Sequence, residues 1–345
     1  MAVTPGGADS PDRILVWGAG AIGGAIAACL GRSGLDVTVV DANEAHIRVI
    51  RERGLAITGP IETFTQLLPA YTPDDLAGVW NTVFLCVKAL HTQTAARQLA
   101  AYLAADAVVV SLQNGFNELI IAETVGRERT MGAFINFGAD VLEPGVVYLG
   151  GRGAVVVGEL DGRQTQRLAS VHRALQYFEA GAITTDNIWG YLWGKMGYGA
   201  LLFASALTPA SIVDVLDSRE ARPVLTALAR EVMAVAAAER VTPMGFNGYD
   251  PTAFSLNGTR AAIDASFEAM VAFNRSSAKT HSGVWRDIAI HHRKTECDAQ
   301  FAPILELARR YRVAIPHVER LVSLMREVES GARSQAMDNL LRLHA

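Results

Sequence analysis

Short apolar runs alternate with helix-like segments along the first half of the chain. The runs are rich in β-branched residues, and apolar residues recur every three or four positions in the segments between them. Parallel strands joined by helical crossovers produce this alternation. The predicted strands cover Ile14–Trp17, Val37–Val40 and residues 83–87 and 107–112. The pattern therefore predicts an α/β fold that begins with a doubly wound, mostly parallel sheet.

The pattern changes twice further along the chain. Between residues 132 and 159, Pro-Gly and Gly-Gly turns separate short strands, which predicts antiparallel strands that close one edge of the sheet. Beyond Asn187 the strand signals nearly vanish and helical periodicity takes over. The predicted helices cover residues 223–240, 253–273 and 284–312, with a final pair over 316–343. We expect a loose tail at 1–12, a sheet domain at 13–186 and an all-α domain at 187–345.

Composition and charge narrow the class of protein. The 345 residues suffice for two domains, and 50% hydrophobic with 19% charged residues is typical of a soluble globular chain. A formal net charge of −4 provides no basic field for nucleic acid or an anionic membrane surface. The most apolar run, residues 196–207, is shorter than the roughly 20 residues that a membrane span requires. We expect it to be a buried helix, and we expect no nucleic-acid or membrane partner.

The cysteines and the first residues indicate the compartment. Cys29, Cys86 and Cys297 are few, scattered and odd in number, which argues against a disulfide framework and fits a reducing cytoplasm. Cys29 and Cys86 lie in apolar runs, so we expect buried thiols there. Residues 1–12 have neither the basic start nor the apolar core of a signal peptide. We therefore expect a cytoplasmic protein.

A glycine cluster joins the first predicted strand to the first predicted helix. Gly18 permits a tight turn, Gly20 lets the backbone approach a diphosphate, and Gly23 lets the helix pack closely on the strand. A plain strand-to-helix connection is the alternative, but strand, turn, helix and second strand occur here in the order of a Rossmann-type dinucleotide site. The candidate cofactor-binding residues of this turn are Gly18, Ala19, Gly20, Ala21, Ile22 and Gly23.

Asp41 ends the second predicted strand, at the spacing expected for a ribose-binding acid. A carboxylate at this position accepts hydrogen bonds from the adenosine ribose diol and repels a 2′-phosphate. No arginine follows at Ala42 or Asn43, and Arg48 and Arg51 lie further along the next helix. Asp41 therefore favours NAD(H) over NADP(H). An ordinary residue at the end of a strand is the alternative.

Two polar residues follow predicted strands of the sheet, where ligands bind in doubly wound folds. Lys88 stands in the segment CVKA and Asn114 in the segment LQNG. Asn114 can equally belong to an ordinary Asn-Gly turn. No spacing of histidine, cysteine or carboxylate residues indicates a metal site, since His291 and His292 would face different sides of a helix.

Lys195 lies among apolar neighbours at the start of the helical half. Gly190, Gly194 and Gly197 recur there at helical spacing, which predicts a bare helix face against which another segment packs closely. An exposed lysine is the common alternative. A lysine held near the ligand crevice would instead be able to donate a proton to a carbonyl oxygen.

Together these motifs resemble the ketopantoate reductase (2-dehydropantoate 2-reductase) family, over a range from residue 13 to about residue 331. The matching segments, in order, are the glycine turn, CVKA with Lys88, LQNG with Asn114, LWGK with Lys195, the helix start from Ser282 to Asp287, and RKTE with Glu296. The resemblance implies an NAD(P)-dependent oxidoreductase of pantothenate biosynthesis that reduces an α-keto acid, ketopantoate, to pantoate. It also implies a dinucleotide on the N-terminal domain and a keto acid in a cleft between the domains.

The resemblance also implies a role for each polar residue. Lys195 would be the general acid at the keto oxygen, where its charge stabilises the developing oxyanion most. Glu296 would hold a substrate hydroxyl and orient Lys195. Asn114 and Lys88 would line the nicotinamide side, with Asn114 also near the substrate, and Ser282 would contact the substrate carboxylate.

Several positions depart from the family pattern. The family usually carries asparagines one and two turns after the lysine, where this chain has Gly199 and Phe203, and its paired serine is here Ser282-Gly283. Phe203, Tyr198 and Trp285 predict a substrate pocket that is more apolar than one built for a small hydroxylated acid. The family commonly prefers NADP(H) and carries a basic residue at the position where this chain has Asp41.

Relative to the family pattern, one extra residue stands between Asp287 and Glu296. An added residue turns a helix by about 100°. Either a bulge absorbs that residue or Glu296 points in a new direction.

Other functions stay open at this point. A reductase of a bulkier, more apolar keto acid, or an imine, opine or β-hydroxyacid dehydrogenase, would share the plan of a sheet domain followed by a helical domain. A non-catalytic nucleotide sensor would keep the glycine turn without the chemistry, although Lys195 and Glu296 together favour an enzyme. Apolar helices such as residues 224–238 would suit a homodimer, while a monomer core explains the same pattern.

Overall fold

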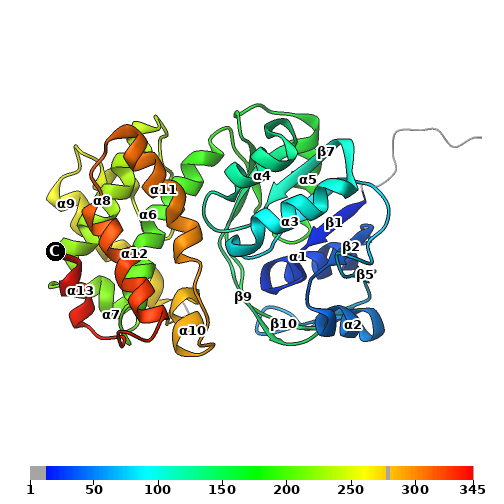
Figure 1. Cartoon of the computed structure of the whole chain (residues 1–345), viewed down its shortest axis with the longest axis horizontal. Helices are drawn as coiled ribbons and strands as arrows, with labels where there is room; N and C mark the ends of the chain where they lie inside the picture. Colours follow the sequence, from blue (N-terminus) through cyan, green and yellow to red (C-terminus); the bar gives the residue numbers. More distant parts are fainter. Residues whose placement is uncertain (1–12, 277–279, 345) are drawn as a thin grey trace, which may run out of the picture. The chain divides into compact units, whose positions relative to one another are not determined.

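The computed structural model describes residues 13–276 and 280–344. The loose tail expected at residues 1–12 lies outside the described residues. The chain forms two compact units (Figure 1), the first ending at Asp186 and the second beginning at Asn187. The tripeptide Asn114–Phe116 groups with the second unit, although it lies within the sequence of the first. A single boundary near residue 187 does not account for this tripeptide.

The main sheet of the first unit has eight strands in its described part, in the order β12-β11-β8-β7-β6-β1-β2-β5. Neighbouring strands are parallel except β8 and β11. The chain passes from β2, on one side of β1, to β6, on the other, which confirms the doubly wound sheet and places its topological switch point at β1 and β6. The bounds are β1 (Ile14–Trp17), β2 (Val37–Val40), β5 (Ala70–Tyr71), β6 (Trp80–Leu85), β7 (Leu103–Ser111), β8 (Thr130–Ile135), β11 (Val155–Glu159) and β12 (Ile183–Thr184).

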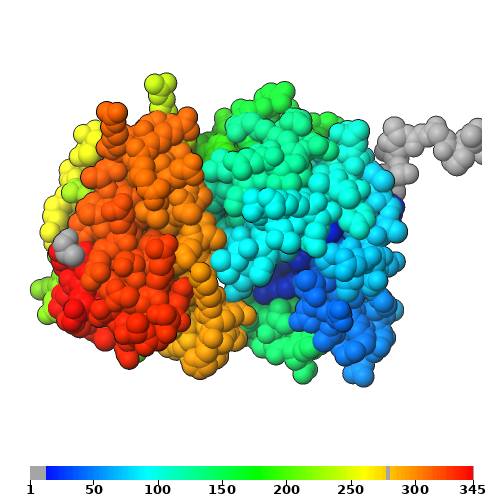
Figure 2. Space-filling view, viewed as in Figure 1, coloured from blue at the N-terminus to red at the C-terminus, as the bar shows by residue number. Residues whose placement is uncertain are grey.

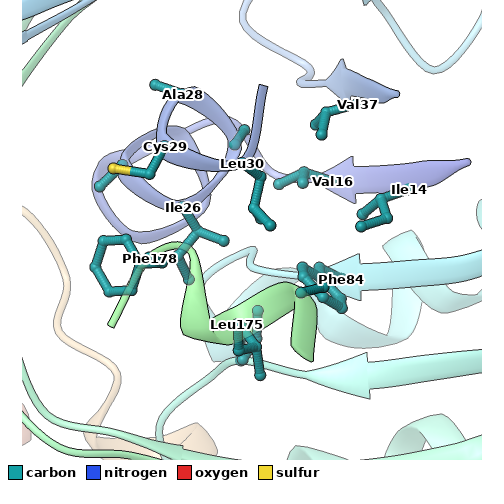
Figure 3. Packing of buried hydrophobic residues seen from close by; sticks show 14 of the residues in the cluster. Ile14, Val16, Ile26, Ala28, Cys29, Leu30, Val37, Phe84, Leu175 and Phe178 are labelled. Atoms are coloured by element: carbon teal, nitrogen blue, oxygen red, sulfur yellow. The ribbon is translucent and has the colours of Figure 1, made fainter. Parts of the chain in front are cut away.

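Helices cover both faces of this sheet. Side chains alternate across a strand, so Ile14 and Val16 of β1 belong to one hydrophobic cluster while Leu15 and Trp17 belong to another. The first cluster includes residues of α1 and α5, and Figure 3 shows Phe84 of β6 within it. The second cluster includes residues of α3 and α4. Burial on both faces explains why these strands are continuous apolar runs.

The helices of the first unit are α1 (Ala21–Arg32), α2 (Glu44–Arg53), α3 (Thr92–Leu99), α4 (Asn117–Val125) and α5 (Gln166–Gln176), with short 3₁₀ turns η1 (Ala89–His91), η2 (Ala100–Tyr102) and η3 (Arg127–Arg129).

A second, smaller sheet corrects the expectation for residues 132–159. Among the described strands of the main sheet, β8 and β11 are the one antiparallel pair, and β12 lies outside β11 as the edge strand. The hairpin between β8 and β11 joins β3, in the order β4-β3-β10-β9. Val147 and Leu149 are buried in the same cluster as the core of α1, so this sheet supplies further cover for that helix. The apolar pattern reports burial, and it does not say which sheet a strand joins. The bounds are β3 (Leu55–Thr58), β4 (Phe64–Gln66), β9 (Gly138–Glu143) and β10 (Val146–Gly151).

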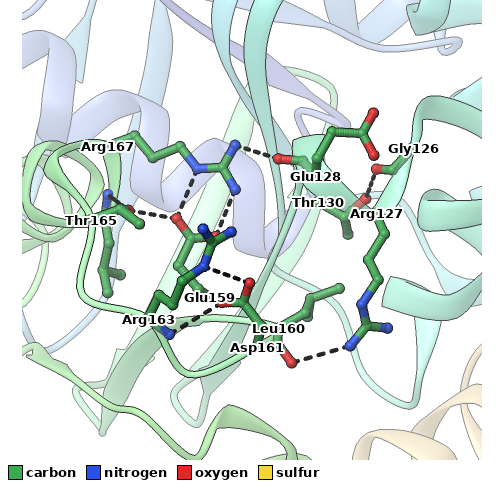
Figure 4. A network of polar contacts seen from close by, with 11 residues as sticks. Gly126, Arg127, Glu128, Thr130, Glu159, Leu160, Asp161, Arg163, Thr165 and Arg167 are labelled. Atoms are coloured by element: carbon green, nitrogen blue, oxygen red, sulfur yellow. Dashed lines mark hydrogen bonds and ion pairs between the residues drawn. The ribbon is translucent and has the colours of Figure 1, made fainter.

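A polar network fastens α5 to the edge of the main sheet (Figure 4). The buried carboxylate of Glu159 accepts hydrogen bonds from Arg167 at 2.7 and 2.6 Å and from Thr165 at 2.5 Å. The hydrogen bond to Glu159 raises the pKa of Arg167. Arg167 also donates to the carbonyl oxygen of Glu128, before β8. This network holds the start of α5 against β11, away from the switch point.

The second unit is helical. In the space-filling view (Figure 2), the last helices of the chain form much of its visible face. The single helix predicted over residues 284–312 is two helices, because residues 290–296 leave the helical path. The helix predicted over residues 253–273 is likewise a 3₁₀ turn followed by a helix. The bounds are α6 (Ile188–Ala206), α7 (Ile212–Asp217), α8 (Arg222–Ala238), η4 (Pro251–Phe254), α9 (Arg260–Arg275), α10 (Gly283–Ala289), α11 (Cys297–Tyr311), α12 (Pro316–Glu329), α13 (Asp338–Leu341) and η5 (Arg342–His344).

Burial within the single chain bears on several expectations. The apolar run at residues 196–207 lies almost wholly in α6 and is mostly buried, as expected. The larger apolar side chains of α8, from Val224 to Val235, are buried as well, so they require no second copy of the chain to cover them. Cys29 and Cys297 are buried, Cys86 is half-buried, and all three are free thiols. No helix in residues 13–276 or 280–344 is long and apolar enough to cross a membrane.

Candidate functional site

The glycine turn lies at the switch point of the main sheet. Gly18 follows β1 with φ of 101°, and a Cβ atom there would lie 2.8 Å from the backbone nitrogen of Val87, just beyond β6. A Cβ atom at Gly23 would lie 2.0 Å from the carbonyl oxygen of Gly18. At Gly20, by contrast, no atom lies within 4 Å of such a Cβ atom. The fold therefore requires glycine at Gly18 and Gly23, whereas Gly20 leaves open space beside the start of α1.

Two side chains hold the backbone of Ala19 within this turn. Asp41 accepts the N–H of Ala19 at 2.9 Å through Oδ2 and the N–H of Asn43 at 2.9 Å through Oδ1. His46, in α2, bonds through Nε2 to the carbonyl oxygen of Ala19 at 2.9 Å. His46 is buried, with 3% of its surface exposed. A lone histidine in an amphipathic helix belongs to no motif, so the sequence carries no signal for the role of His46.

The end of β6, next to the turn, is held by a buried polar cluster. Gln113 donates through Nε2 to the carbonyl oxygen of Val87 and to Oγ1 of Thr92, each at 2.7 Å. Thr92 in turn donates to Oδ1 of Asn117 at 2.8 Å. Lys88, half-buried, follows Val87 directly and precedes η1. Gln113, part of the LQNG segment, therefore fixes the backbone directly before Lys88.

Cys86 lies directly after β6, next to the glycine turn. Its Cβ atom would be 2.8 Å from a Cβ atom added at Gly23, so it packs against the glycine turn. Burial raises the pKa of the Cys86 thiol, which keeps it protonated and a poor nucleophile near neutral pH. Within the described parts of the chain, no three His, Cys, Asp or Glu residues are grouped to hold a metal ion.

In the second unit, the bare face predicted for α6 is confirmed. A Cβ atom at Gly194 would lie 1.9 Å from the carbonyl oxygen of Met244, and Met244 donates its N–H to the carbonyl oxygen of Gly190 at 2.9 Å. At Gly197 an added Cβ atom would lie 2.2 Å from the hydroxyl oxygen of Tyr249. The segment 242–249 therefore packs directly on the backbone of α6.

Lys195 occupies a different face of α6. It is half-buried, as is Gly199 one helical turn later. No atom lies within 4 Å of a Cβ atom built at Gly199. Lys195 is thus neither sealed in the core nor fully exposed, and there is open space next to it along the helix.

The tripeptide Asn114–Phe116 packs between α6 and α11. The ring of Phe116 lies 4.6 Å from that of Trp193, two residues before Lys195. A Cβ atom at Gly115 would lie 3.1 Å from Cγ of Gln300. The N–H of Gln300 donates to the carbonyl oxygen of Glu296 at 2.9 Å. The segment that carries Asn114, itself exposed, therefore contacts both helices that carry the predicted acid and its partner.

Ser282 is the N-cap of α10, a helix that packs against α6. Its Oγ accepts the N–H of Trp285 at 3.1 Å, and the residue is buried. Trp285 donates through Nε1 to the carbonyl oxygen of Thr208 at 3.1 Å. Ser282 therefore has an evident structural role as a helix cap, while its own hydroxyl hydrogen can still be donated.

The chain between α10 and α11 leaves the helical path before Glu296. His292 adopts φ of 48°, and Arg293 folds back so that its side chain bonds Asp287 at 2.7 and 2.6 Å. Thr295 is held by Glu329, which accepts its backbone N–H at 2.9 Å. A residue added within this non-helical stretch does not by itself rotate a helix. Glu296, half-buried, is the N-cap residue of α11.

Two of the three residues predicted to line an apolar pocket, Tyr198 and Phe203, are buried in the helical unit. Tyr198 accepts a hydrogen bond from Asn274 at 2.8 Å, and burial raises its pKa to about 12. The ring of Phe203 is buried 5.2 Å from that of Phe301. Both side chains belong to the core of the helical unit, because this face of α6 packs on other helices.

Two protein-family models match the chain. The model described as Ketopantoate reductase PanE/ApbA matches residues 14–162, and the model described as Ketopantoate reductase PanE/ApbA C terminal matches residues 187–329. The 2-dehydropantoate 2-reductase of Halobacterium salinarum is 27% identical over 91% of this chain and 98% of its own length. The enzyme of the same name from Archaeoglobus fulgidus is 28% identical over 92% of this chain and 98% of its own.

Solved structures share the fold. The ternary structure of D-mandelate dehydrogenase with NADH and anilino(oxo)acetate has a TM-score of 0.79 at 22% identity, covering 92% of this chain and 98% of that one. The PanE/ApbA family ketopantoate reductase from Ralstonia eutropha JMP134 has a TM-score of 0.77 at 23% identity, with the same coverage. The matches span both units. The chain belongs to the ketopantoate reductase family, whose members are NAD(P)-dependent oxidoreductases acting on CH–OH groups.

Proposed function

We propose that the protein binds a nicotinamide dinucleotide at its glycine turn and reduces the keto group of an α-keto acid, with ketopantoate to pantoate as the reaction. The observation that supports this most is the packing of the tripeptide Asn114–Phe116 in the second unit. It contacts α6 at Trp193, two residues before Lys195 in the sequence, and α11 one turn after Glu296. The curated relatives are named for the same reaction.

The residues of the glycine turn fit a dinucleotide diphosphate. Open space lies beside Gly20, and no side chain caps the start of α1. The N–H groups of the first helical turn can therefore bond an anion, which the helix dipole also favours. A dinucleotide bound there supplies the hydride for the reduction.

We propose NAD(H) as the cofactor. The carboxylate of Asp41 is fixed at the end of β2 by its bonds to the N–H groups of Ala19 and Asn43. Each of its oxygens keeps a lone pair for the ribose diol, and its negative charge repels a 2′-phosphate. Arg51 is engaged elsewhere, donating to the carbonyl oxygen of Ala70 at 3.1 and 2.9 Å. Titration with each reduced cofactor tests this choice, and tighter binding of NADPH would contradict it.

In the proposed reaction the keto carbon gains a hydride and the keto oxygen gains a proton. Lys195 donates a hydrogen bond from its ammonium group to the keto oxygen and passes a proton to it as negative charge develops. This interaction is strongest in the transition state, so it lowers the barrier. Lys195 then regains a proton from water. Glu296 accepts a hydrogen bond from a substrate hydroxyl and orients the lysine, and Ser282 donates its hydroxyl hydrogen to the substrate carboxylate.

A bulkier or more apolar keto acid is the second candidate substrate. The open space beside Gly199 favours it, because no side chain there limits the size of a group next to Lys195 or bonds a hydroxyl. A comparison of kcat/KM for ketopantoate and for keto acids with larger apolar groups distinguishes the two. Higher values for the larger keto acids would replace ketopantoate and leave the chemistry of Lys195 intact.

Lys195→Met tests the proposed reaction. We expect kcat to fall by at least about a hundredfold, the scale of a lost general acid, while the dissociation constant for NADH stays within about threefold of wild type. Lys294→Met is the matched control, because Lys294 is largely exposed and pairs with Asp298 at 3.1 Å on the surface of α11. A near-normal kcat for Lys195→Met would remove this lysine from the mechanism. Absence of turnover with every keto acid by the wild-type protein would favour a nucleotide sensor.

A further inference from the structure

A single buried histidine connects the glycine turn to a remote hairpin. His46 bonds through Nε2 to the carbonyl oxygen of Ala19, in the turn, at 2.9 Å. Through Nδ1 it meets the N–H of Gly145, also at 2.9 Å. Gly145 has φ of 77° and lies in the turn between β9 and β10, 99 residues away in the sequence.

The two partners of His46 determine where its proton lies. The N–H of Gly145 can only donate, so Nδ1 must carry a lone pair and no hydrogen. The carbonyl oxygen of Ala19 can only accept, so Nε2 must carry the hydrogen. His46 is therefore held as the neutral Nε2–H tautomer, and it donates to the turn. The backbone N–H of Gly145, in the β9–β10 turn, thus determines which ring nitrogen of His46 donates.

The donated bond fixes the direction of the next amide. The described chain has no cis peptide bond, and a trans peptide directs its oxygen and its N–H to opposite sides. Because the oxygen of Ala19 points to His46, the N–H of Gly20 points away from it. Ala19 is fully buried, whereas Gly20 is partly exposed and borders open space. The N–H of Gly20 therefore points away from His46 at a residue that is partly exposed, where it is available to an anion.

We propose that His46 is a positioning residue for the dinucleotide diphosphate. It keeps the peptide between Ala19 and Gly20 in the orientation that presents an N–H to the anion. Rotation of that peptide would present a carbonyl oxygen instead, and two negative groups would then face each other. Asp41 cannot supply this control alone, because it holds the N–H of Ala19 and so acts on the preceding peptide. The proposal rests on the proposed binding of a dinucleotide at the glycine turn.

The test compares variants of the full chain by their affinity for ADP-ribose, which carries the diphosphate and needs no catalysis. His46→Leu removes the donor, and His46→Gln restores a donor that can reach Ala19. His172→Leu is the matched control, since His172 also bonds through Nε2 to a backbone carbonyl, that of Ala182 at 2.7 Å, in the same unit but on α5. Calorimetry gives the dissociation constants, and thermal unfolding shows how much stability each variant loses.

We expect His46→Leu to weaken ADP-ribose binding by at least about tenfold, as for the loss of one hydrogen bond to a charged group. His46→Gln should bind within about threefold of wild type, and so should His172→Leu even where its melting temperature falls. If His46→Leu does not fold, His46→Asn replaces it, because its shorter amide cannot reach Ala19.

Two results would overturn the proposal. One is wild-type affinity in His46→Leu, or in the Asn variant that replaces it. The other is an equal loss of affinity in His172→Leu, which would mean that lost stability alone weakens binding. If the wild-type chain itself binds neither ADP-ribose nor NADH, the proposed function fails, and the role of His46 fails only with it.

Discussion

Gly20→Ala should separate the binding of a dinucleotide from the folding of the glycine turn. Gly20 is the N-cap residue of α1, and its φ of −67° is in the range that non-glycine residues adopt. A Cβ atom there meets nothing within 4 Å. Alanine at an N-cap costs up to about 1 kcal/mol relative to glycine, and restricting the unfolded chain returns about 0.4–1 kcal/mol. We therefore expect the free energy of unfolding to change by less than about 1 kcal/mol.

The new methyl group would nevertheless occupy the space through which a diphosphate approaches the backbone. We expect the affinity for NADH and for ADP-ribose to fall by at least about tenfold, which corresponds to about 1.4 kcal/mol. Gly23→Ala is the matched change at the other end of the motif. Its Cβ atom would lie 2.0 Å from the oxygen of Gly18 and 2.8 Å from Cβ of Cys86, so it should destabilise the fold by about 1–3 kcal/mol or more.

Urea denaturation measures the stability of both variants, and quenching of protein fluorescence by NADH measures binding. Because the two substitutions add the same methyl group, any general effect of replacing glycine in the motif appears in both. Wild-type affinity in Gly20→Ala would refute the assignment of this turn to the diphosphate. Wild-type stability in Gly23→Ala would refute the steric account of the turn.

Two further predictions concern α6. Gly194→Ala should lower the free energy of unfolding in urea denaturation by about 1–3 kcal/mol, because its methyl group would lie 1.9 Å from the carbonyl oxygen of Met244. An unchanged midpoint would show that the segment 242–249 can move away at little cost. Gly199→Asn should fold normally, since the space there is open, and should raise kcat/KM for ketopantoate relative to a keto acid without a hydroxyl group. An unchanged ratio would mean that this position does not face the substrate.

The sequence predicted best those elements whose burial is complete and whose ends are marked by turns. Ile14–Trp17 and Val37–Val40 are correct to the residue, because a parallel strand covered on both faces is apolar throughout. The strand predicted over residues 83–87 ends at Leu85. Val87 is as apolar as the residues before it, but its backbone packs against Gly18 and its carbonyl oxygen accepts a hydrogen bond from Gln113. Periodicity cannot register such a contact.

The helix break before Glu296 shows a second limit. Residues 290–296 contain neither proline nor glycine, so local propensity gives no reason for the helix to stop. The break depends on tertiary contacts, in particular the bonds of Arg293 to Asp287 and of Thr295 to Glu329. Similarly, His46 could not be predicted as a partner of the glycine turn, because its tautomer depends on Gly145, which lies far along the chain.

The residues proposed for binding and those proposed for chemistry belong to different units, and this gives the two roles separate measurable consequences. Asp41, His46 and the glycine turn all lie in the first unit, while Lys195 and Glu296 lie in the second together with Asn114. Substitutions in the first group should change the affinity for ADP-ribose, which lacks the nicotinamide ring. Substitution of Lys195 should leave that affinity unchanged and lower kcat. If Lys195→Met instead weakened ADP-ribose binding as much as Gly20→Ala does, the lysine would have to act on the nucleotide, and its assignment as the acid at the keto oxygen would have to be abandoned.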